Sequence, residues 1–223
     1  EDAMLGEAYG LGFDEVVASS AEHNVGFDEM LDFVVSKLES EEFDTDDDEI
    51  RVTLVGRPNV GKSSLINMLT RNSKLAKIGK TPGKTRIINA FIINQKFCLM
   101  DLPGYGFAKI GENEKRRFSE LIEFYLNSSE QLRHVFLLLD IRHAPTQDDK
   151  LMLDWLYYYQ KPFSIIATKA DKLSRAQQAK RIIELSRETG IISSDIYPVS
   201  AVNGEGREKL LERMGELTVC GQN

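Results

Sequence analysis

Residues 51–63 read RVTLVGRPNVGKS, a short apolar run that leads directly into Gly56, four further residues, and Gly61-Lys62-Ser63. This spacing is the signature of a phosphate-binding P-loop, and it lies between a predicted strand and a predicted helix, as the motif requires. Glycines let successive backbone N–H groups turn toward phosphate oxygens, and the helix N-terminus adds the positive end of its dipole. Lys62 can then reach the β- and γ-phosphates, and the Ser63 hydroxyl can bind Mg²⁺.

The sequence around this motif alternates between short β-rich runs and helical segments, which predicts an α/β fold. We expect a P-loop NTPase domain whose six-stranded, mostly parallel sheet is flanked by helices on both faces. The predicted strands are Arg51–Val55, Ile87–Ile93, Phe97–Asp101, His134–Asp140, Ser164–Thr168 and Ile196–Val199. The predicted helices are Lys62–Thr70, Glu114–Asn127, Gln147–Gln160, Arg175–Thr189 and Arg207–Leu217.

Two local signals refine this prediction. The strands on either side of Asn94-Gln95 are so close in sequence that they should form an antiparallel hairpin. Two of the helices have N-terminal capping signals, Thr146 with Asp149 three residues later and Ser174 with Gln177 three residues later.

A second motif lies about forty residues after the P-loop, a spacing that makes it a strong signal. The run FCLMD ends in Asp101 and continues as Leu102-Pro103-Gly104, which places a carboxylate at the tip of a strand beside the P-loop. Asp101 can hold Mg²⁺ through a water molecule, because this small cation keeps part of its hydration shell. Gly104 can give its N–H to a γ-phosphate and move when that phosphate leaves.

Between the two motifs lies TPGKTR, residues 81–86. A threonine hydroxyl here can complete a Mg²⁺ shell only while the γ-phosphate is bound, which would make the loop a sensor of the nucleotide. Pro82-Gly83 gives Thr81 a turn role, so Thr85 is the preferred ligand and Thr81 the alternative.

The base preference follows from Thr168-Lys169-Ala170-Asp171, at the end of another predicted strand. An aspartate offers two acceptors that match the adjacent N1–H and N2–H₂ donors of guanine, a pairing that adenine cannot make. The stem of Lys169 would lie along the base. An ATPase would leave Asp171 without a role, so the sequence favours GTP.

Two residues bear on hydrolysis. Tyr105 follows Gly104, where many GTPases carry a glutamine that orients the attacking water, so intrinsic hydrolysis should be slow. Asn59 offers a carbonyl that can help to hold a monovalent cation such as K⁺ near the phosphates. Equally, Asn59 can serve only to shape the loop, and the sequence leaves both interpretations open.

Charge divides the chain of 223 residues, whose net charge is −7. Residues 1–50 hold 17 acidic side chains against Lys37 alone, whereas the remainder holds 27 basic and 18 acidic side chains. Residues 27–38 have the spacing of one amphipathic helix, and residues 39–49 are nearly all acidic. Two cysteines provide neither a disulfide framework nor metal-ligand spacing, and the apolar runs are too short for a membrane span. We expect a cytoplasmic, monomeric protein that does not bind membranes.

Several motifs together resemble the EngB GTPases over residues Ile50–Leu217. They are GRPNVGKSSLIN, TPGKTR followed by an Asn, DLPGYGFA, the pair Asp140 and Arg142, TKADKL and the closing Ser200-Ala201. The resemblance implies a TRAFAC-type G domain that binds GTP and GDP with Mg²⁺, hydrolyses GTP, and acts as a switch in assembly of the large ribosomal subunit.

The resemblance also implies a set of site residues. Nucleotide contacts are expected at Gly56, Arg57, Pro58, Asn59, Val60, Gly61, Lys62, Ser63, Gly83, Lys84, Thr85, Arg86, Ile87, Asp101, Leu102, Pro103, Gly104, Thr168, Lys169, Ala170, Asp171, Val199, Ser200 and Ala201. The resemblance places the metal at Ser63 and Thr85, and the DxxG motif adds Asp101 as a ligand through water. Together the motifs predict catalytic contributions from Lys62, Thr85 and Gly104.

Two features depart from the EngB pattern. Gly56-Arg57-Pro58 is more similar to the P-loop of Der (EngA), and residues 9–38 resemble the end of the first G domain of Der. We therefore expect residues 1–39 to be a Der-like remnant or extension, 40–49 an acidic linker and 50–219 an EngB-type G domain. An acidic extension that docks on the basic domain is one alternative, and part of a Der-like double GTPase is another.

The basic residues near the predicted switches suggest a partner. Lysines and arginines gather in two clusters, at Lys74, Lys77, Lys80, Lys84 and Arg86 and at Lys115, Arg116 and Arg117. Such clusters can contact the phosphate backbone of RNA without reading its sequence, so rRNA and proteins of the large ribosomal subunit are the expected partners. A solvated charged surface is the alternative. A different class of function is a nucleotide-gated binding module with negligible hydrolysis.

Overall fold

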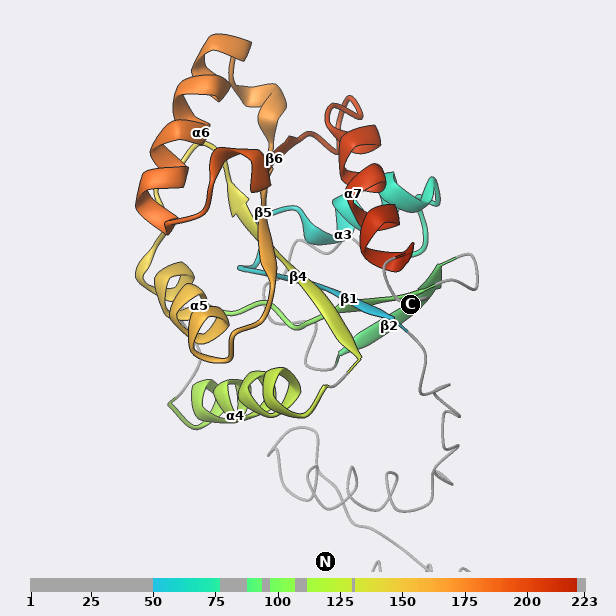
Figure 1. The fold of residues 1–223 in the computed structure, drawn as a ribbon, viewed down its shortest axis with the longest axis vertical. Coiled ribbons are helices and arrows are strands. Elements are labelled where there is room, and N and C mark those ends of the chain that lie inside the picture. Colours follow the sequence, from blue (N-terminus) through green and yellow to red (C-terminus); the bar gives the residue numbers. More distant parts are fainter. Residues whose placement is uncertain (1–49, 77–87, 94–96, 107–111, 130, 220–223) are drawn as a thin grey trace, which may run out of the picture. The chain divides into compact units, whose positions relative to one another are not determined.

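The computed structural model describes residues 50–76, 88–93, 97–106, 112–129 and 131–219 (Figure 1). The chain divides into two units, residues 1–46 and 47–223, and all described residues belong to the second. The predicted helix at 27–38 and the predicted acidic linker lie outside the described residues. So do the loop TPGKTR and the residues around Asn94-Gln95.

A six-stranded sheet in the order β2-β3-β1-β4-β5-β6 forms the centre of the second unit. All neighbours pair in parallel except β2 and β3, which are antiparallel, so the mostly parallel α/β sheet is confirmed. The strands are β1 (Arg51–Gly56), β2 (Asn89–Ile93), β3 (Phe97–Asp101), β4 (Leu132–Asp140), β5 (Phe163–Thr168) and β6 (Ile196–Val199).

The helices agree closely with the predicted ones. They are α3 (Lys62–Thr70), α4 (Glu112–Ser128), α5 (Gln147–Tyr158), α6 (Arg175–Thr189) and α7 (Arg207–Val219). The prediction extended α5 to Gln160, which is wrong, because Gln160 takes a left-handed backbone with φ 51°. The capping boxes of Thr146 with Asp149 and of Ser174 with Gln177 are both present.

The hairpin of β2 and β3 is also confirmed. Its register runs from Asn89 opposite Asp101 to Ile93 opposite Phe97. β3 then pairs in parallel with β1, with Leu54 next to Asp101. The hairpin therefore brings the end of β3 to the end of β1, where the P-loop begins.

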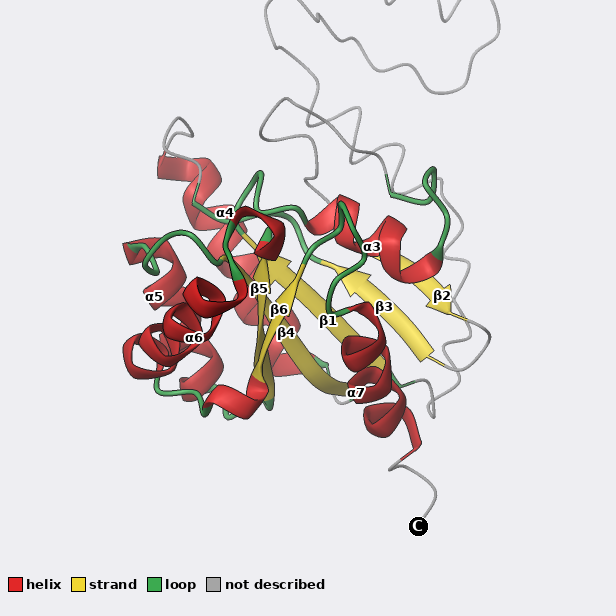
Figure 2. Cartoon of the chain, turned by 90° about the horizontal axis from the view of Figure 1, so that it is seen from above, coloured by secondary structure: helices red, strands yellow, loops and turns green. Residues whose placement is uncertain are grey.

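Helices cover the sheet on both faces, α4, α5 and α6 on one and α3 and α7 on the other (Figures 1 and 2). Alternate residues of β1 enter the two cores, since Val55 packs with α4 and α5 whereas Val52 and Leu54 pack with α3 and α7. Fully buried Phe136 and Leu137 divide in the same way along β4. The two cores fix the strands and leave the loops after β1, β3, β4, β5 and β6 to form one edge.

No helix among the described residues is long and apolar enough to span a membrane.

The edge at the carboxyl ends of the parallel strands is the usual place for ligands in open α/β sheets. In the sheet, β1 lies between β3 and β4. The strand order therefore reverses at β1, which is the topological switch point of the sheet. The P-loop predicted from the sequence begins at this switch point.

Candidate functional site

The P-loop lies between the end of β1 and the start of α3, in a conformation that specific residues permit. Gly56 packs against β4 so closely that a Cβ on it would lie 2.9 Å from the Cβ of Leu138. Gly61 has φ 100° directly before α3, and Asn59 has φ 63°, a left-handed backbone that asparagine tolerates. The left-handed backbone of the exposed Asn59 forms part of the bend of this loop.

Lys62 points from the P-loop to the end of β3. Its Nζ lies 2.8 Å from Asp101 Oδ1 and also donates a hydrogen bond to the backbone carbonyl of Leu102. Burial lowers the pKa of Lys62, and the neighbouring carboxylate of Asp101 opposes this effect. The first two predicted motifs therefore meet at this ion pair.

The residues at this point suit a hard cation. Apart from the ion pair, buried Asp101 Oδ1 has no hydrogen-bond partner in the described part of the chain. Ser63, the next residue after Lys62, adds a hydroxyl at the start of α3. Carboxylate, hydroxyl and water oxygens are the ligands that Mg²⁺ prefers, so Asp101 and Ser63 fit the predicted metal site. Thr85 lies outside the described residues, as do Gly83, Lys84, Arg86 and Ile87.

The segment after β3 returns across the P-loop. A Cβ placed on Gly104 would lie 3.2 Å from both Cδ and the backbone N of Pro58, so the two segments are in close contact. Leu102 and Pro103 are buried, which fixes the start of the segment. Gly104 therefore lies against the first residues of the P-loop.

Tyr105 points away from this edge and into the protein. Its side chain is only 4% exposed, and its hydroxyl donates to Asp149 Oδ1 at 2.7 Å. Burial, reinforced by the nearby carboxylate, raises the pKa of Tyr105 well above its usual value, so the hydroxyl stays protonated. Tyr105 occupies the sequence position of the glutamine found in many GTPases, but its side chain is held by α5.

Asp149 is the centre of a cluster that sequence reasoning recognised only as a helix cap. Its Oδ2 accepts from the backbone N and the Oγ1 of Thr146, each at 2.8 Å, and lies 3.2 Å from Arg57 Nε. The P-loop, the segment after β3 and the start of α5 thus share one buried carboxylate. The capping signal did not indicate that Asp149 is buried, since the same signal at Ser174 and Gln177 joins two exposed residues.

The last residue of β5 and the residue that follows it each bind the P-loop through their side chains. The buried Thr168 hydroxyl contacts the backbone carbonyls of Val60 at 2.7 Å and Leu139 at 3.1 Å. Lys169 Nζ donates to the backbone carbonyl of Asn59 at 2.8 Å and lies 2.9 Å from Asp140 Oδ2. The threonine of TKAD is therefore a structural link between two loops.

Asp140, at the end of β4, holds both Lys169 and Arg142. Arg142 donates to it from its backbone N, its Nε and its Nη2, the last at 2.7 Å. Although burial opposes the effect, hydrogen bonds from Arg142 and Lys169 hold the pKa of Asp140 far below its usual range. Asp140 and Arg142 were recognised as a motif, but the contact of Asp140 with Lys169 was not predicted.

Asp171 is prepared to act as a hydrogen-bond acceptor. Ser200 Oγ, buried in the loop after β6, donates to Asp171 Oδ1 at 2.7 Å. This bond, with a contribution from Lys172, lowers the pKa of Asp171, so its carboxylate stays charged at neutral pH. Ser200 in turn accepts from the backbone N of Val202 at 3.1 Å. The loops after β5 and β6 are therefore joined at the carboxylate predicted to read the base.

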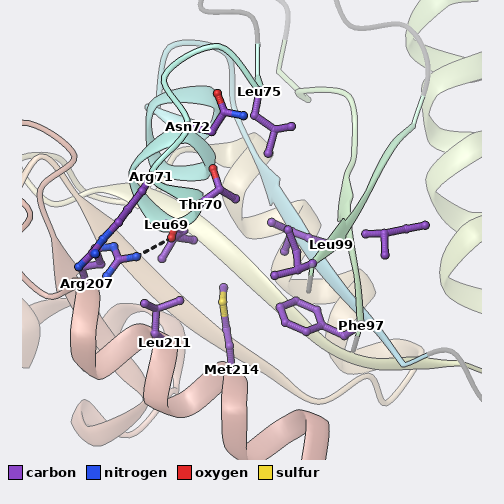
Figure 3. A pocket seen from close by; sticks show the side chains of 12 residues that line it. Leu69, Thr70, Arg71, Asn72, Leu75, Phe97, Leu99, Arg207, Leu211 and Met214 are labelled. Carbon is purple, nitrogen blue, oxygen red and sulfur yellow. Dashed lines mark hydrogen bonds between the residues drawn. The ribbon is translucent and has the colours of Figure 1, made fainter. Parts of the chain in front are cut away.

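A separate pocket of about 390 Å³ lies between the end of α3, the β2–β3 hairpin and α7 (Figure 3). The apolar walls of the pocket include Leu211, Met214, Phe97 and Leu99. At its other end Arg207 donates to the backbone carbonyls of Met68 and Leu69, at 2.9 and 2.8 Å. None of the predicted nucleotide contacts lines this pocket.

The strand order and the four motifs along one edge define a P-loop GTPase domain. Residues 51–169 match the family described as 50S ribosome-binding GTPase. A probable GTP-binding protein EngB of Clostridium kluyveri is 46% identical over 185 residues, which are 81% of this chain and 92% of the relative. Its counterpart in Syntrophomonas wolfei is 48% identical over 166 residues, covering 74% and 86%.

A solved structure agrees with these relatives. The crystal structure of a probable GTP-binding protein EngB superposes with a TM-score of 0.64 at 25% identity, covering 75% of this chain and 98% of that one. The chain belongs to the EngB family of GTP-binding proteins. The resemblance seen in the sequence motifs is thereby confirmed.

Proposed function

We propose that this chain binds GTP and GDP at the edge formed by the loops after β1, β3, β5 and β6, and hydrolyses GTP as a switch in assembly of the large ribosomal subunit. The observation that carries the proposal is the hydrogen bond from Ser200 to Asp171, which keeps a charged carboxylate in place beside Lys169. Since Lys169 also binds the P-loop carbonyl of Asn59, base and phosphate positions belong to one connected unit.

Each segment has a distinct role in this proposal. The backbone of residues 56–63 surrounds the phosphates, and Lys62 leaves its ion pair with Asp101 to contact the β- and γ-phosphates. Gly104 offers its N–H to the γ-phosphate. Asp171 accepts from the guanine N1–H and N2–H₂ groups, Lys169 covers the base, and residues 199–201 close its far side.

Mg²⁺ belongs to the same proposal. Ser63 and Thr85 would hold it directly, with Asp101 contributing through water, and when bound it neutralises charge on the β- and γ-phosphate oxygens. A K⁺ ion near Asn59 remains a proposal of its own. If hydrolysis proceeds equally in K⁺ and Na⁺, this part is wrong.

Base recognition is tested by Asp171→Asn. Wild-type protein should prefer GDP over XDP, and the variant should prefer XDP, because an amide donates where the carboxylate accepts. Asp154→Asn is the matched control, since Asp154 is an exposed acid on α5 away from this edge. Affinities are measured by calorimetry with Mg²⁺. Loss of binding to both bases in the variant, or an unchanged preference for guanine, would contradict the assignment.

Ribosomal RNA is the proposed partner, supported by the family description and by basic residues near the switches. Among those described, Lys74 is exposed and Arg116 is exposed with Glu120 2.9 Å away. Binding to large ribosomal subunits should be stronger with a non-hydrolysable GTP analogue than with GDP, and should weaken as salt rises. Binding that ignores both nucleotide and salt would count against this proposal.

One observation favours a second candidate function, a nucleotide-gated binding module with negligible hydrolysis. Tyr105 is held by Asp149 and presents no water-orienting amide to the phosphate edge. Single-turnover hydrolysis with and without large ribosomal subunits separates the candidates. Acceleration by the subunits supports the GTPase switch, and absence of turnover under both conditions supports the module.

A further inference from the structure

Asp149 joins three segments of the proposed nucleotide edge through one carboxylate that is only 2% exposed. A buried carboxylate is costly unless its oxygens are hydrogen-bonded or paired, and here both oxygens have partners. Tyr105 occupies Oδ1, whereas Arg57 and Thr146 occupy Oδ2. This Asp149 cluster, consisting of Asp149, Tyr105, Arg57 and Thr146, therefore favours one arrangement of its three segments.

Two members of the cluster are sequence neighbours of Gly104 and Pro58, which are in contact. Tyr105 directly follows Gly104, and Arg57 directly precedes Pro58, so both sides of that contact are fastened to the same carboxylate. Gly106 extends the close approach, because it has φ +79° and a Cβ on it would lie 2.6 Å from Asp148 Oδ2. A shift of either side would therefore strain a contact with the carboxylate at the start of α5.

We propose that Asp149 and Tyr105 are positioning residues that keep Gly104 over the P-loop, where its N–H meets the γ-phosphate of GTP. The same contacts carry the state of the nucleotide to the first turn of α5. This inference rests on the proposed nucleotide site. GDP lacks the γ-phosphate, so its binding does not depend on where Gly104 lies.

The first turn of α5 connects the buried carboxylate to the protein surface. Gln147, Asp148 and Lys150 are exposed on either side of buried Asp149, so a shift of the carboxylate moves side chains that face solvent. A switch of this kind depends on a segment that the γ-phosphate holds in place.

Tyr105→Phe tests the positioning role, because it keeps the buried ring and removes one hydroxyl. Tyr125→Phe is the matched control, since Tyr125 is 5% exposed and its hydroxyl lies 2.6 Å from Thr53 Oγ1, within the core beneath α4. Both variants should unfold at lower denaturant. Only Tyr105→Phe should weaken binding of a non-hydrolysable GTP analogue, by about tenfold, while GDP affinity stays within about twofold. Equal weakening of both nucleotides, or no weakening, would overturn the proposal.

Hydrogen exchange of the wild-type protein provides a second test that needs no variant. Backbone amides of residues 147–150 should exchange more slowly with the GTP analogue than with GDP, whereas amides at the start of α6 should not differ. Identical exchange at α5 in the two states would overturn the coupling. Failure of wild-type protein to bind GDP would instead contradict the proposed nucleotide site, so the two failures are distinguishable.

Discussion

Lys169 Nζ lies 2.9 Å from Asp140 Oδ2, which connects the TKAD segment after β5 to the last residue of β4. The same nitrogen donates to the Asn59 carbonyl in the P-loop at 2.8 Å. The backbone of Lys169 is left-handed, with φ 62°. Its ammonium group is therefore held by both β4 and the P-loop. Asp140 therefore helps to set the position of the side chain proposed to cover the base.

Asp140→Asn should weaken GDP and GTP analogue binding together, by roughly tenfold. The amide cannot balance the charges of Lys169 and Arg142, and hydrogen bonds to charged groups contribute about 1.5–3 kcal/mol. Calorimetric titration of both nucleotides measures the effect, with Asp154→Asn as the control. Because the ratio of the two affinities should not change, this variant is also distinguishable from Tyr105→Phe. Unaltered affinities would show that Lys169 needs no partner on β4.

Thr168→Val should destabilise the protein and weaken nucleotide binding. The variant has nearly the same shape, but it leaves the buried carbonyls of Val60 and Leu139 without the threonine donor, at a cost of about 1–3 kcal/mol. Thr189→Val is a matched control, since Thr189 is 5% exposed and donates to Leu185 O at the end of α6. Urea denaturation should show a loss in both variants, and GDP affinity should fall only in Thr168→Val. An equal effect on GDP affinity in both would contradict the link between β5 and the P-loop.

Local patterns in the sequence were sufficient for most of the fold. The strand into the P-loop, the helix caps and the β2–β3 hairpin are all decided by residues within a few positions of one another. The end of α5 was missed by two residues, since the aromatic run Tyr157–Tyr159 continues the helical pattern while Gln160 takes φ 51°. Ends of helices depend on backbone conformations that composition does not reveal.

The connections within the site could not be predicted, because they join residues that are far apart in the sequence. Tyr105 and Asp149 are separated by 44 positions, and Thr168 and Val60 by 108. The glycine-rich and acidic motifs indicate which chemistry is present, whereas packing of α5 against the sheet decides that Tyr105 turns inward. Motifs therefore predicted the residues of the edge but not how its loops are fastened to one another.

Removal of the two helix caps should have unequal effects. Ser174→Ala at the start of α6 removes an exposed capping box and should lower the free energy of unfolding by about 1 kcal/mol. Thr146→Ala should cost more, roughly 2 kcal/mol, because the Thr146 hydroxyl donates to the buried carboxylate of Asp149, whereas the Ser174 hydroxyl donates to an exposed amide oxygen of Gln177. Denaturant unfolding at neutral pH compares the two variants. Equal losses would show that the Thr146 hydroxyl acts only as a cap.

His134 should make stability depend on pH below neutrality. Its ring is 3% exposed, with Nε2 2.9 Å from Ser164 Oγ, and burial, aided by Arg213, lowers its pKa from 6.5 to about 4. Between these values the unfolded chain binds a proton that the folded protein does not, so stability falls as pH drops through this window. From about pH 7 to pH 5 the loss attributable to His134 should be about 2 kcal/mol, since one pKa unit corresponds to about 1.4 kcal/mol.

His134→Gln isolates this contribution, because glutamine can still bond to Ser164 but does not titrate in this range. Urea unfolding of both proteins at each pH gives the difference between their slopes, and carboxylates that titrate in both cancel. The variant will be less stable at neutral pH if the ring leaves a gap beside Phe136, which lies 4.9 Å away between ring centroids. Its stability should nevertheless fall less on acidification. Parallel pH profiles would show that His134 is protonated as easily in the folded protein as in the unfolded chain.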